Sequence, residues 1–477
     1  MANSKYEYVK SFEANDEVMF PNLIVVRIDG RDFRRFSEVH EFERPNDEKA
    51  LNLMNACAIS VLEEYPDIVF SYGFSDEYSD IIAEVMMQNS IPHCFFFLFD
   101  ICYKMEGVFP HERYEISPTF NGRVICCATI EVLQEYLAWR QNDCHANNQY
   151  NTCLWKLVES GKTEKEAQEI LKEEDIAKYS ENGTPVKRLR RKARILHSEN
   201  IAGRSFWNVH QNLLKQLGCF AEDIGKINPD YIRSFLFENK LMPSTWIVIR
   251  IDGCHFHRFC DVHAFEKPND VQALNLMNSC AVAVLEEFQD VIFSYGVSDE
   301  YSFVLKKDSK FLQRQASGIV SAIVSFFSSM YVMNWKSFFP QKELKYTPSF
   351  DGRAICYPSS EILRDYLAWR QVDCHINNQY NTCFWALVKS GKSKSDAQNT
   401  LKGTQALEKN QILAQFGIDY NALPAILRQG SSVFSVKEDV VIHENGSSVE
   451  KLRNKVIVEY CNIIEQSFWE AHPGILD

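Results

Sequence analysis

The chain has 477 residues and a formal net charge of −13. Of its residues, 45% are hydrophobic and 24% charged, as in globular proteins with two or three domains. The acidic balance argues against a broad basic surface for nucleic acid, but not against a nucleic-acid substrate held through metal ions and local basic patches. No apolar run approaches the roughly 20 residues of a membrane span, so we expect no membrane contact.

Fifteen cysteines without any C-x-x-C pair indicate reduced thiols in a cytosolic or nuclear compartment. One local cluster has the residue types of a zinc site: Cys254, His255, His257 and Cys260. Four ligands within seven residues are sterically awkward. The matching places in the first half of the chain hold Arg31, Asp32, Arg34 and Ser37. We therefore do not expect structural zinc.

A basic run, VKRLRRKAR at 186–194, fits a phosphate-contact patch, a nuclear-localisation signal or a solvated linker. The sequence leaves these readings open. We expect the protein in the nucleus or the cytoplasm, with the nucleus slightly favoured.

The chain is a tandem duplication. Residues 45–64 (PNDEKALNLMNACAISVLEE) and 268–287 (PNDVQALNLMNSCAVAVLEE) agree at 15 of 20 positions. The offset between the copies grows from 223 to 230 and then to 262, so the first copy lacks 7 residues in one place and 32 in another. We expect two domains, residues 1–219 (repeat one) and residues 220–477 (repeat two).

The two losses make the repeats unequal. Asp80 places a charge where repeat two has Phe303, and the second loss removes the equivalent of residues 402–434. We expect the hairpin strand at 301–305 to be intact only in repeat two. Repeat one is then a structural or regulatory half, and repeat two is the catalytic one.

In repeat two, residues 244–251 predict a strand, and Asn269-Asp270 predicts the cap of an amphipathic helix. A strand at 290–295, a turn, a strand at 301–305 and a helix at 311–331 follow. A strand at 346–357, built around an Asp351-Gly352 turn, precedes a mainly helical region at 361–388. The order β-α-β-β-α-β predicts an α+β fold, a ferredoxin-like antiparallel sheet with helices on one face and a C-terminal helical elaboration.

Each repeat carries two acids separated by 47 positions. Asp29 ends VVRIDG and Asp76 follows in SDEY, while Asp252 ends VIRIDG and Asp299 follows in SDEY. Carboxylates at neighbouring strand ends can share one or two Mg²⁺ ions and orient an attack on a phosphoryl group. Either motif alone is more typical of a turn, but the spacing, found twice, favours a metal-dependent nucleotidyl-transfer site. The adjacent acids complete the candidate catalytic set: Glu77 and Glu300.

A second polar segment is DCHINNQYNT at 373–382, mirrored by DCHANNQYNT at 143–152. Dense polar residues between two apolar helical runs predict a helix–helix junction, in which Asn377 or Asn378 caps the second helix. The alternative is that His375 and the asparagines bind phosphates or the end of a nucleic acid.

Together, Asp-Gly after the first strand, SDEYSFV and DCHINNQYNT resemble the eukaryotic tRNA(His) guanylyltransferase family. The resemblance covers repeat two nearly from end to end, and repeat one with gaps. It implies a polymerase-palm-like domain that adds a guanine nucleotide to the 5′ end of tRNA(His), in the 3′–5′ direction. In that reaction ATP activates the 5′-monophosphate and GTP is then joined. The cofactor would be Mg²⁺, two per active site.

The resemblance also assigns residues. The metal ligands would be Asp29, Gly30, Asp76, Asp252, Gly253 and Asp299. GTP would contact the two DG segments, the two SD pairs and a few residues near the guanine: Asp29, Gly30, Arg31, Asp32, Phe33, Arg34, Ser75, Asp76, Asp252, Gly253, Cys254, His255, Phe256, His257, Lys267, Asn269, Asp270, Ser298 and Asp299. Nucleotide activation or tRNA contact would use His145, Asn147, Asn148, His375, Asn377 and Asn378.

One stretch departs from the family. Where the family has a pattern like R-R-A-S-K that holds triphosphate, repeat two has Arg314-Gln315-Ala316-Ser317-Gly318, without two of the three cations. The alternatives to an active transferase are a tRNA-binding or scaffolding pseudoenzyme and a palm-fold nucleotide cyclase. The partners expected are tRNA(His), GTP, ATP and a second copy of the chain, so that two tandem chains resemble a family tetramer.

Overall fold

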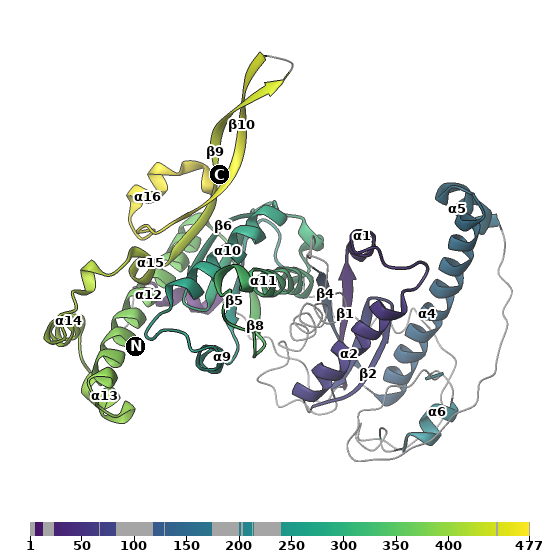
Figure 1. Cartoon of the computed structure of the whole chain (residues 1–477), viewed down its shortest axis with the longest axis horizontal. Coiled ribbons are helices and arrows are strands. Elements are labelled where there is room, and N and C mark those ends of the chain that lie inside the picture. Colours follow the sequence, from purple (N-terminus) through teal and green to yellow (C-terminus); the bar gives the residue numbers. More distant parts are fainter. Residues whose placement is uncertain are drawn as a thin grey trace. The chain divides into compact units, whose positions relative to one another are not determined.

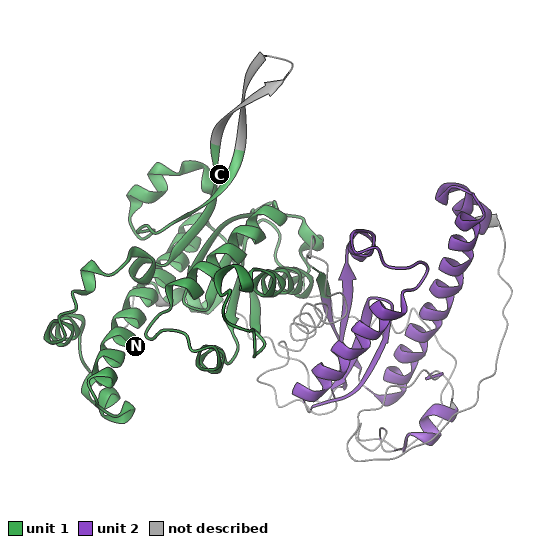
Figure 2. Ribbon diagram, in the orientation of Figure 1, with its two compact units in different colours: residues 1–16, 117–121, 238–477 green, residues 17–116, 122–237 purple. Residues whose placement is uncertain are grey.

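The computed structural model describes residues 5–12, 23–65, 67–82, 118–127, 129–173, 200–201, 204–211, 213, 240–444 and 447–476. The chain forms two compact units (Figure 2). Unit 1 contains Met1–Asp16, Ser117–Asn121 and Glu238–Asp477, and unit 2 contains Glu17–Ile116 and Gly122–Phe237. The expected boundary between residues 219 and 220 lies outside the described residues and stays a prediction.

The centre of unit 1 is a six-stranded sheet in the order β10-β9-β6-β7-β5-β8. Its strands are β5 (Trp246–Gly253), β6 (Val291–Val297), β7 (Glu300–Leu305), β8 (Phe350–Tyr357), β9 (Ser431–Glu444) and β10 (Ser447–Glu459). The described pairings are all antiparallel. The inner four strands, in the order β6-β7-β5-β8, have the ferredoxin-like arrangement, which confirms the predicted palm. The long β9–β10 hairpin extends this sheet beyond the palm (Figure 1).

Helices connect the strands of this sheet and cover both of its faces. They are α9 (Phe256–Val262), α10 (Val271–Glu287), α11 (Ala316–Phe338), α12 (Ser360–Lys389), α13 (Lys394–Leu401), α14 (Ala406–Gln415), α15 (Ala425–Gln429) and α16 (Gln466–Ala471). Short 3₁₀ turns are η1 (Glu7–Phe12), η2 (Phe311–Arg314), η3 (Tyr420–Ala422) and η4 (Pro473–Ile475). Asp270 caps α10 by accepting from the backbone N–H groups of Gln272 and Ala273, as predicted.

The sheet of unit 1 is covered on both faces. On one face, Tyr301 and Phe303 of β7 pack against Phe327 of α11, which also lies against α10. On the other, Val248 and Tyr366 belong to the core that α12 closes. The predicted covering helices are therefore present, and α12 adds a layer that was not predicted.

Among the described residues, one helix, α11, is long and apolar enough to cross a membrane by length and composition alone. Of its most apolar window, 78% is buried inside the protein. Gly352 shows how closely the helix approaches the sheet, because a Cβ at this position would lie 2.6 Å from Val324 Cγ2. The burial is that of a core helix.

Unit 2 has a four-stranded sheet in the order β2-β3-β1-β4, which is the same palm arrangement. Its elements are β1 (Leu23–Arg31), α1 (Phe33–Val39), α2 (Glu48–Glu64), β2 (Ile68–Phe74), β3 (Glu77–Ile82), β4 (Thr119–Cys127), α4 (Ile130–Glu159), α5 (Glu164–Glu173) and α6 (Arg204–Val209). The prediction that the hairpin strand is intact only in repeat two is wrong. β3 pairs along its whole length with β1, from Asp29↔Glu77 to Ile24↔Ile82.

Asp80 does not break β3, because a strand is held by backbone hydrogen bonds and its side chain has a polar neighbour. The carboxyl group is buried and lies opposite Ser71 of β2 in the strand pairing. Burial raises the pKa of Asp80 to about 6.

Two further expectations are wrong. Asp351-Gly352 is no turn: both residues lie inside β8, paired with Asp252 and Ile251 of β5. The 373–382 segment is no helix junction either, since α12 runs unbroken over 30 residues and α4 does the same in unit 2. Ser359 and Thr129 cap these helices, not the asparagines within them.

Candidate active site

In unit 1, the sheet brings the predicted acids together at one end of β5. Asp252 lies opposite Glu300 of β7, and the backbone N–H of Gly253 donates to the carbonyl oxygen of Asp299 at 3.1 Å. Asp299 follows Ser298, whose φ of 55° turns the hairpin between β6 and β7. The two acids are therefore fixed by backbone hydrogen bonds and not by flexible loops.

The carboxyl groups of this site oppose one another's ionisation. Burial raises the pKa of Asp252 to about 7, and the charges of Asp299, Glu300 and Asp351 add to the effect. Burial also raises the pKa of Asp299. Buried acids that repel each other in this way are stabilised when a cation binds between them.

Gly253 leaves space at this point that another residue would fill. A Cβ here would lie 2.5 Å from the ring of Phe256 and 2.9 Å from Asp299 Oδ2. A backbone carbonyl beside two carboxylates supplies only hard oxygen donors, which suits Mg²⁺. Among the described residues, no group of three or more His, Cys, Asp or Glu side chains is arranged to hold a metal. The donor set therefore fits an ion that completes its shell with phosphates and water.

Asp351 is a third acid that the sequence did not reveal. It lies directly across from Asp252 on β8, and burial raises its pKa. An Asp-Gly pair is a common turn signal, and this hid its place in a strand. No clear signal in the sequence contradicted a turn here, because the burial pattern of β8 is visible only in the structure. Repeat one has Asn121 at the matching position.

Glu300 is bound to an arginine. Its Oε1 lies 2.7 Å from Arg370 Nε, and its Oε2 accepts from Arg370 Nη2 at 2.8 Å, while Arg370 Nη1 donates to Asp373 of the polar α12 segment at 3.1 Å. In unit 2, Arg140 holds Glu77 in the same way, with contacts of 2.6 and 2.7 Å. These pairs tie α12 and α4 to the hairpins that carry the acids.

The predicted GTP-binding segment after Gly253 is partly core. Phe256 is buried, with its ring 4.9 Å from that of Phe259 and 5.2 Å from that of Phe350. His255 and His257 lie at the start of α9, with ring centroids 6.3 Å apart. Cys254 donates its backbone N–H to Ser349, and burial raises the pKa of its thiol to about 11.

The residues predicted near the guanine also have structural partners. Lys267 Nζ lies 3.2 Å from Asp261 and 6.0 Å from the centre of the Trp385 ring. Asn269 donates to Asn378, and Asp270 caps α10.

In the polar segment of α12, only part of the surface is accessible. Asn378 is buried, whereas Asn377 is exposed. The carbonyl oxygen of His375 accepts from the hydroxyl of Tyr420, and burial lowers the pKa of the His375 ring. Tyr420 belongs to the 402–434 region that repeat one lacks. On α4 the matching residues His145, Asn147 and Asn148 are exposed.

Arg314, the cation retained from the family's triphosphate pattern, is committed to the backbone. Its Nη1 donates to the carbonyl oxygen of Ser309 at 3.1 Å, and its Nη2 donates to that of Thr245 at 3.0 Å. These bonds use the donors that a triphosphate would need.

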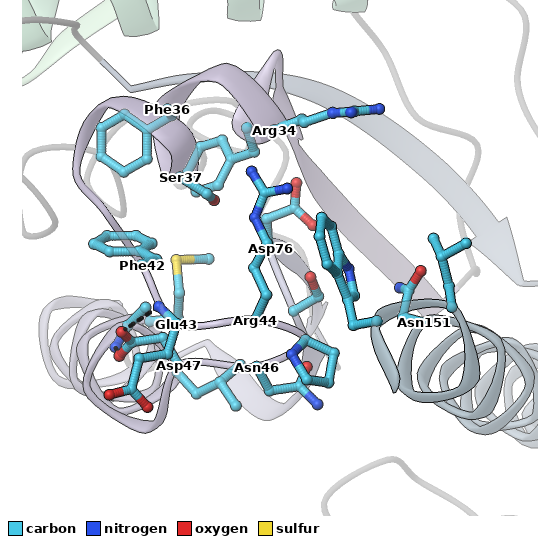
Figure 3. A pocket seen from close by; sticks show the side chains of 18 of the residues that line it. Arg34, Phe36, Ser37, Phe42, Glu43, Arg44, Asn46, Asp47, Asp76 and Asn151 are labelled. Atoms are coloured by element: carbon cyan, nitrogen blue, oxygen red, sulfur yellow. Dashed lines mark hydrogen bonds between the residues drawn. The ribbon is translucent and has the colours of Figure 1, made fainter. Parts of the chain in front are cut away.

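In unit 2 the predicted GTP-binding residues open onto a cavity of about 440 Å³ (Figure 3). Its lining includes Phe33, Arg34, Ser75 and Asp76 from the predicted set. It also includes Arg44, whose guanidinium lies 4.4 Å from the centre of the Trp155 ring.

Acids and bases face each other around this cavity. Figure 3 shows the side chain of Arg44 extending across it towards Asp76. Burial raises the pKa of Asp76 to about 6, and Asp29 adds to the effect. Arg34 Nη2 pairs with Glu164 of α5 at 2.9 Å.

A ferredoxin-like palm with one partly buried acid at the end of its first strand and a second in the neighbouring hairpin turn has the arrangement of a nucleotidyltransferase of the polymerase-palm type. The family model described as tRNAHis guanylyltransferase matches residues 6–128 and 229–358. The model described as Thg1 C terminal domain matches residues 131–181 and 361–465. The chain therefore belongs to the tRNA(His) guanylyltransferase family, in which it carries two copies in tandem.

Relatives agree over the whole chain. The chain is 59% identical to tRNA(His) guanylyltransferase 2 of Arabidopsis thaliana, covering all of this chain and 99% of that protein. It is 60% identical to tRNA(His) guanylyltransferase 1 of the same plant, covering all of this chain and 91% of that protein. A crystal structure of the Saccharomyces cerevisiae enzyme is 38% identical over 47% of this chain and 96% of its own, with a TM-score of 0.42. The predicted family, fold and enzyme class are confirmed.

Proposed function

We propose that repeat two adds a guanine nucleotide to the 5′ end of tRNA(His) by 3′–5′ addition, after ATP has activated that end. The activity is the one that the two full-length plant relatives are named for. The observation that supports repeat two as the active half is Asp351, which lies across from Asp252 in the sheet and which repeat one replaces with Asn121.

Asp252, Asp299 and the Gly253 carbonyl would hold Mg²⁺, in the expected number of two per site. The bound metal would lower the pKa of an attacking hydroxyl and stabilise charge on the phosphoryl oxygens. The protein's own part is to hold the acids rigidly. Backbone hydrogen bonds at Gly253 and the Glu300–Arg370 pair fix the two strands that carry them.

The polar segment of α12 would bind the activating nucleotide or the tRNA end through its accessible members, His375 and Asn377. Asn378 is buried and would act as a positioning residue, because it holds Asn269 beside the expected guanine site. The lowered pKa of His375 keeps its ring neutral at physiological pH, so that it would serve as a neutral donor or acceptor.

Repeat one would bind a nucleotide in its cavity without turning it over. Trp155 and Arg44 offer an aromatic face and a cation, which suit a base and a phosphate. Its acids Asp29 and Asp76 would hold metal, but they lack the third carboxylate. This repeat is then the regulatory or structural half.

Two copies of the chain would associate. Together they carry four family domains, so that the dimer would resemble the expected family tetramer. A sedimentation measurement that finds only monomer at micromolar concentration would contradict this. The basic run at 186–194 lies outside the described residues, and nuclear localisation is proposed on its sequence alone.

Transfer of radiolabelled GTP to tRNA(His) tests the proposal with matched variants. Asp299→Ala is expected to lower transfer by on the order of 100-fold or more, whereas Asp76→Ala leaves it near the wild-type rate. Equal losses in both variants would show that both repeats catalyse.

Two results would favour another function. The first is no transfer by the wild-type chain although it binds tRNA(His). Arg314 would be consistent with a scaffolding role, because its guanidinium donates to backbone carbonyl oxygens and not to a triphosphate. The second is a cyclic product formed from GTP alone, which would identify a nucleotide cyclase.

A further inference from the structure

Residues 5–12 lie in the unit built by repeat two. Val9 of η1 is fully buried in the core shared by β5, β8 and α12. The ring of Phe12 lies 5.6 Å from that of Tyr357 on β8. This segment, although encoded in repeat one, is part of the core of unit 1.

Two polar contacts fix η1 on the first turns of α12. The hydroxyl of Tyr8 donates to Asp365 Oδ2 at 2.5 Å, and this bond raises the pKa of Tyr8 to about 12. The ammonium group of Lys10 lies 5.2 Å from the centre of the Trp369 ring. The docking surface is therefore an acid and a tryptophan one helical turn apart, beside an apolar slot.

The docked sequence occurs twice in the chain. Residues 8–12 read YVKSF and residues 231–235 read YIRSF, at the offset of 223 that also relates Asp29 to Asp252. Both segments place a tyrosine, a β-branched residue, a cation and a phenylalanine in the same order. Residues 231–235 lie outside the described part of the chain.

The docking surface also occurs twice. On α4, Glu135 and Trp139 stand where α12 has Asp365 and Trp369. Glu135 Oε2 is buried, and no hydrogen-bond partner for it exists among the described residues. A buried carboxylate oxygen at the place where Asp365 accepts from Tyr8 calls for a donor such as a tyrosine hydroxyl.

We propose that the two repeats exchange their N-terminal segments, so that residues 6–12 complete repeat two and residues 229–235 complete repeat one. The occupant of the α4 surface is thus a segment of the same chain. Ten residues separate residue 12 from β1, and ten separate residue 235 from β5. A stretch of ten residues spans at most about 35 Å. The two N-terminal segments therefore have the same maximum reach from the strand that follows them.

The exchange would couple the two halves of the protein. The helix that η1 fastens, α12, carries His375 and Asn377 farther along its length. Each repeat would then depend on the other to hold the helix that bears its polar segment.

Photo-crosslinking of the full chain tests the exchange. With p-benzoylphenylalanine in place of Tyr8, peptides around Asp365 are expected to be labelled. With the probe in place of Tyr231, peptides around Glu135 are expected, in a band of monomer mass. Labelling around Asp365 from position 231 would overturn the exchange. A crosslinked band of twice the monomer mass would show that the occupant comes from a second copy and would also overturn it.

Two matched variants, each with one apolar side chain shortened to alanine, give an independent test by amide hydrogen exchange. Val9→Ala is expected to speed amide exchange in β8 and α12 and leave α4 unchanged. Ile232→Ala is expected to speed exchange in β4 and α4 and leave α12 unchanged. Each variant is the control of the other, and the opposite pattern would exclude the exchange.

Discussion

Asn269 and Asn378 are joined by a hydrogen bond, in which Asn269 Nδ2 donates to Asn378 Oδ1 at 2.7 Å. The same bond, also 2.7 Å, joins Asn46 to Asn148 in unit 2. The surroundings differ, because Asn378 is buried and also donates to Tyr420 at 3.3 Å, whereas Asn148 is exposed. The polar segment of the long helix therefore holds the loop before α10 in both repeats, but is covered only in repeat two.

Removing this bond should cost more in repeat two. Asn269→Ala leaves a buried amide oxygen unpaired and is expected to lower the free energy of unfolding by about 1–3 kcal/mol. Asn46→Ala exposes its partner to water and is expected to stay within about 0.5 kcal/mol of the wild type. Urea unfolding followed by tryptophan fluorescence measures both. Equal losses would mean that the covering region around Tyr420 does not matter.

The third acid should affect metal binding in repeat two. Asp351→Asn gives repeat two the residue that repeat one has, and removes a negative charge across from Asp252. The Mg²⁺ concentration for half-maximal GTP transfer is expected to rise about tenfold or more. Asn121→Asp is the matched variant and should leave that concentration unchanged. An unaltered Mg²⁺ requirement in Asp351→Asn would remove this residue from the site.

Glu300 distinguishes a structural role from a catalytic one. Glu300→Ala leaves the buried guanidinium of Arg370 with Asp373 as its remaining acidic partner. We expect the free energy of unfolding to fall by about 3–5 kcal/mol. Glu77→Ala should act alike in unit 2, where Glu77 pairs with Arg27 and Arg140. Normal stability with lost transfer would instead assign Glu300 to the chemistry.

His263 should make unit 1 sensitive to acid. Its Nδ1–H donates to the Phe259 carbonyl, and Nε2 accepts from the backbone N–H of Lys345 at 2.9 Å. Burial lowers the pKa of His263 below 6.5, with nearby lysines adding to the effect. The unfolded chain then binds a proton at a higher pH than the folded one. The contribution of His263 to stability is complete above pH 6.5 and declines as the pH falls below it, until the folded group is protonated too.

A variant isolates this contribution. The pH dependence of unfolding between pH 7 and 5 should be shallower for His263→Gln than for the wild type. Identical slopes would contradict the assignment.

The sequence was sufficient to predict the palm and its two acids because both depend on local signals. A strand that ends in Asp-Gly and a hairpin at SDEY are recognisable from a few residues, and the duplication confirmed their spacing. Asp270 was recognised as a cap for the same reason.

The wrong predictions concern segments whose conformation depends on contacts with residues distant in the sequence. Asp351-Gly352 has turn chemistry, but β5 and α11 hold it in a strand. The asparagines of α12 resemble a helix junction, but they lie inside one continuous helix, where Asn269 and Tyr420 bind the side-chain amide of Asn378. The docking of η1 was not foreseen, because its partner Asp365 is 357 positions away.

That separation also sets an order of events during synthesis. Tyr8 is synthesised well before its acceptor on α12, which follows 357 residues later. At about 5–20 residues per second, the N-terminal peptide waits roughly 20–70 s before its site exists. Through that interval Val9 and Phe12 are hydrophobic groups without their native site, and a nascent-chain chaperone would find them there. Only when α12 has emerged can Val9 and Phe12 pack into the core of unit 1.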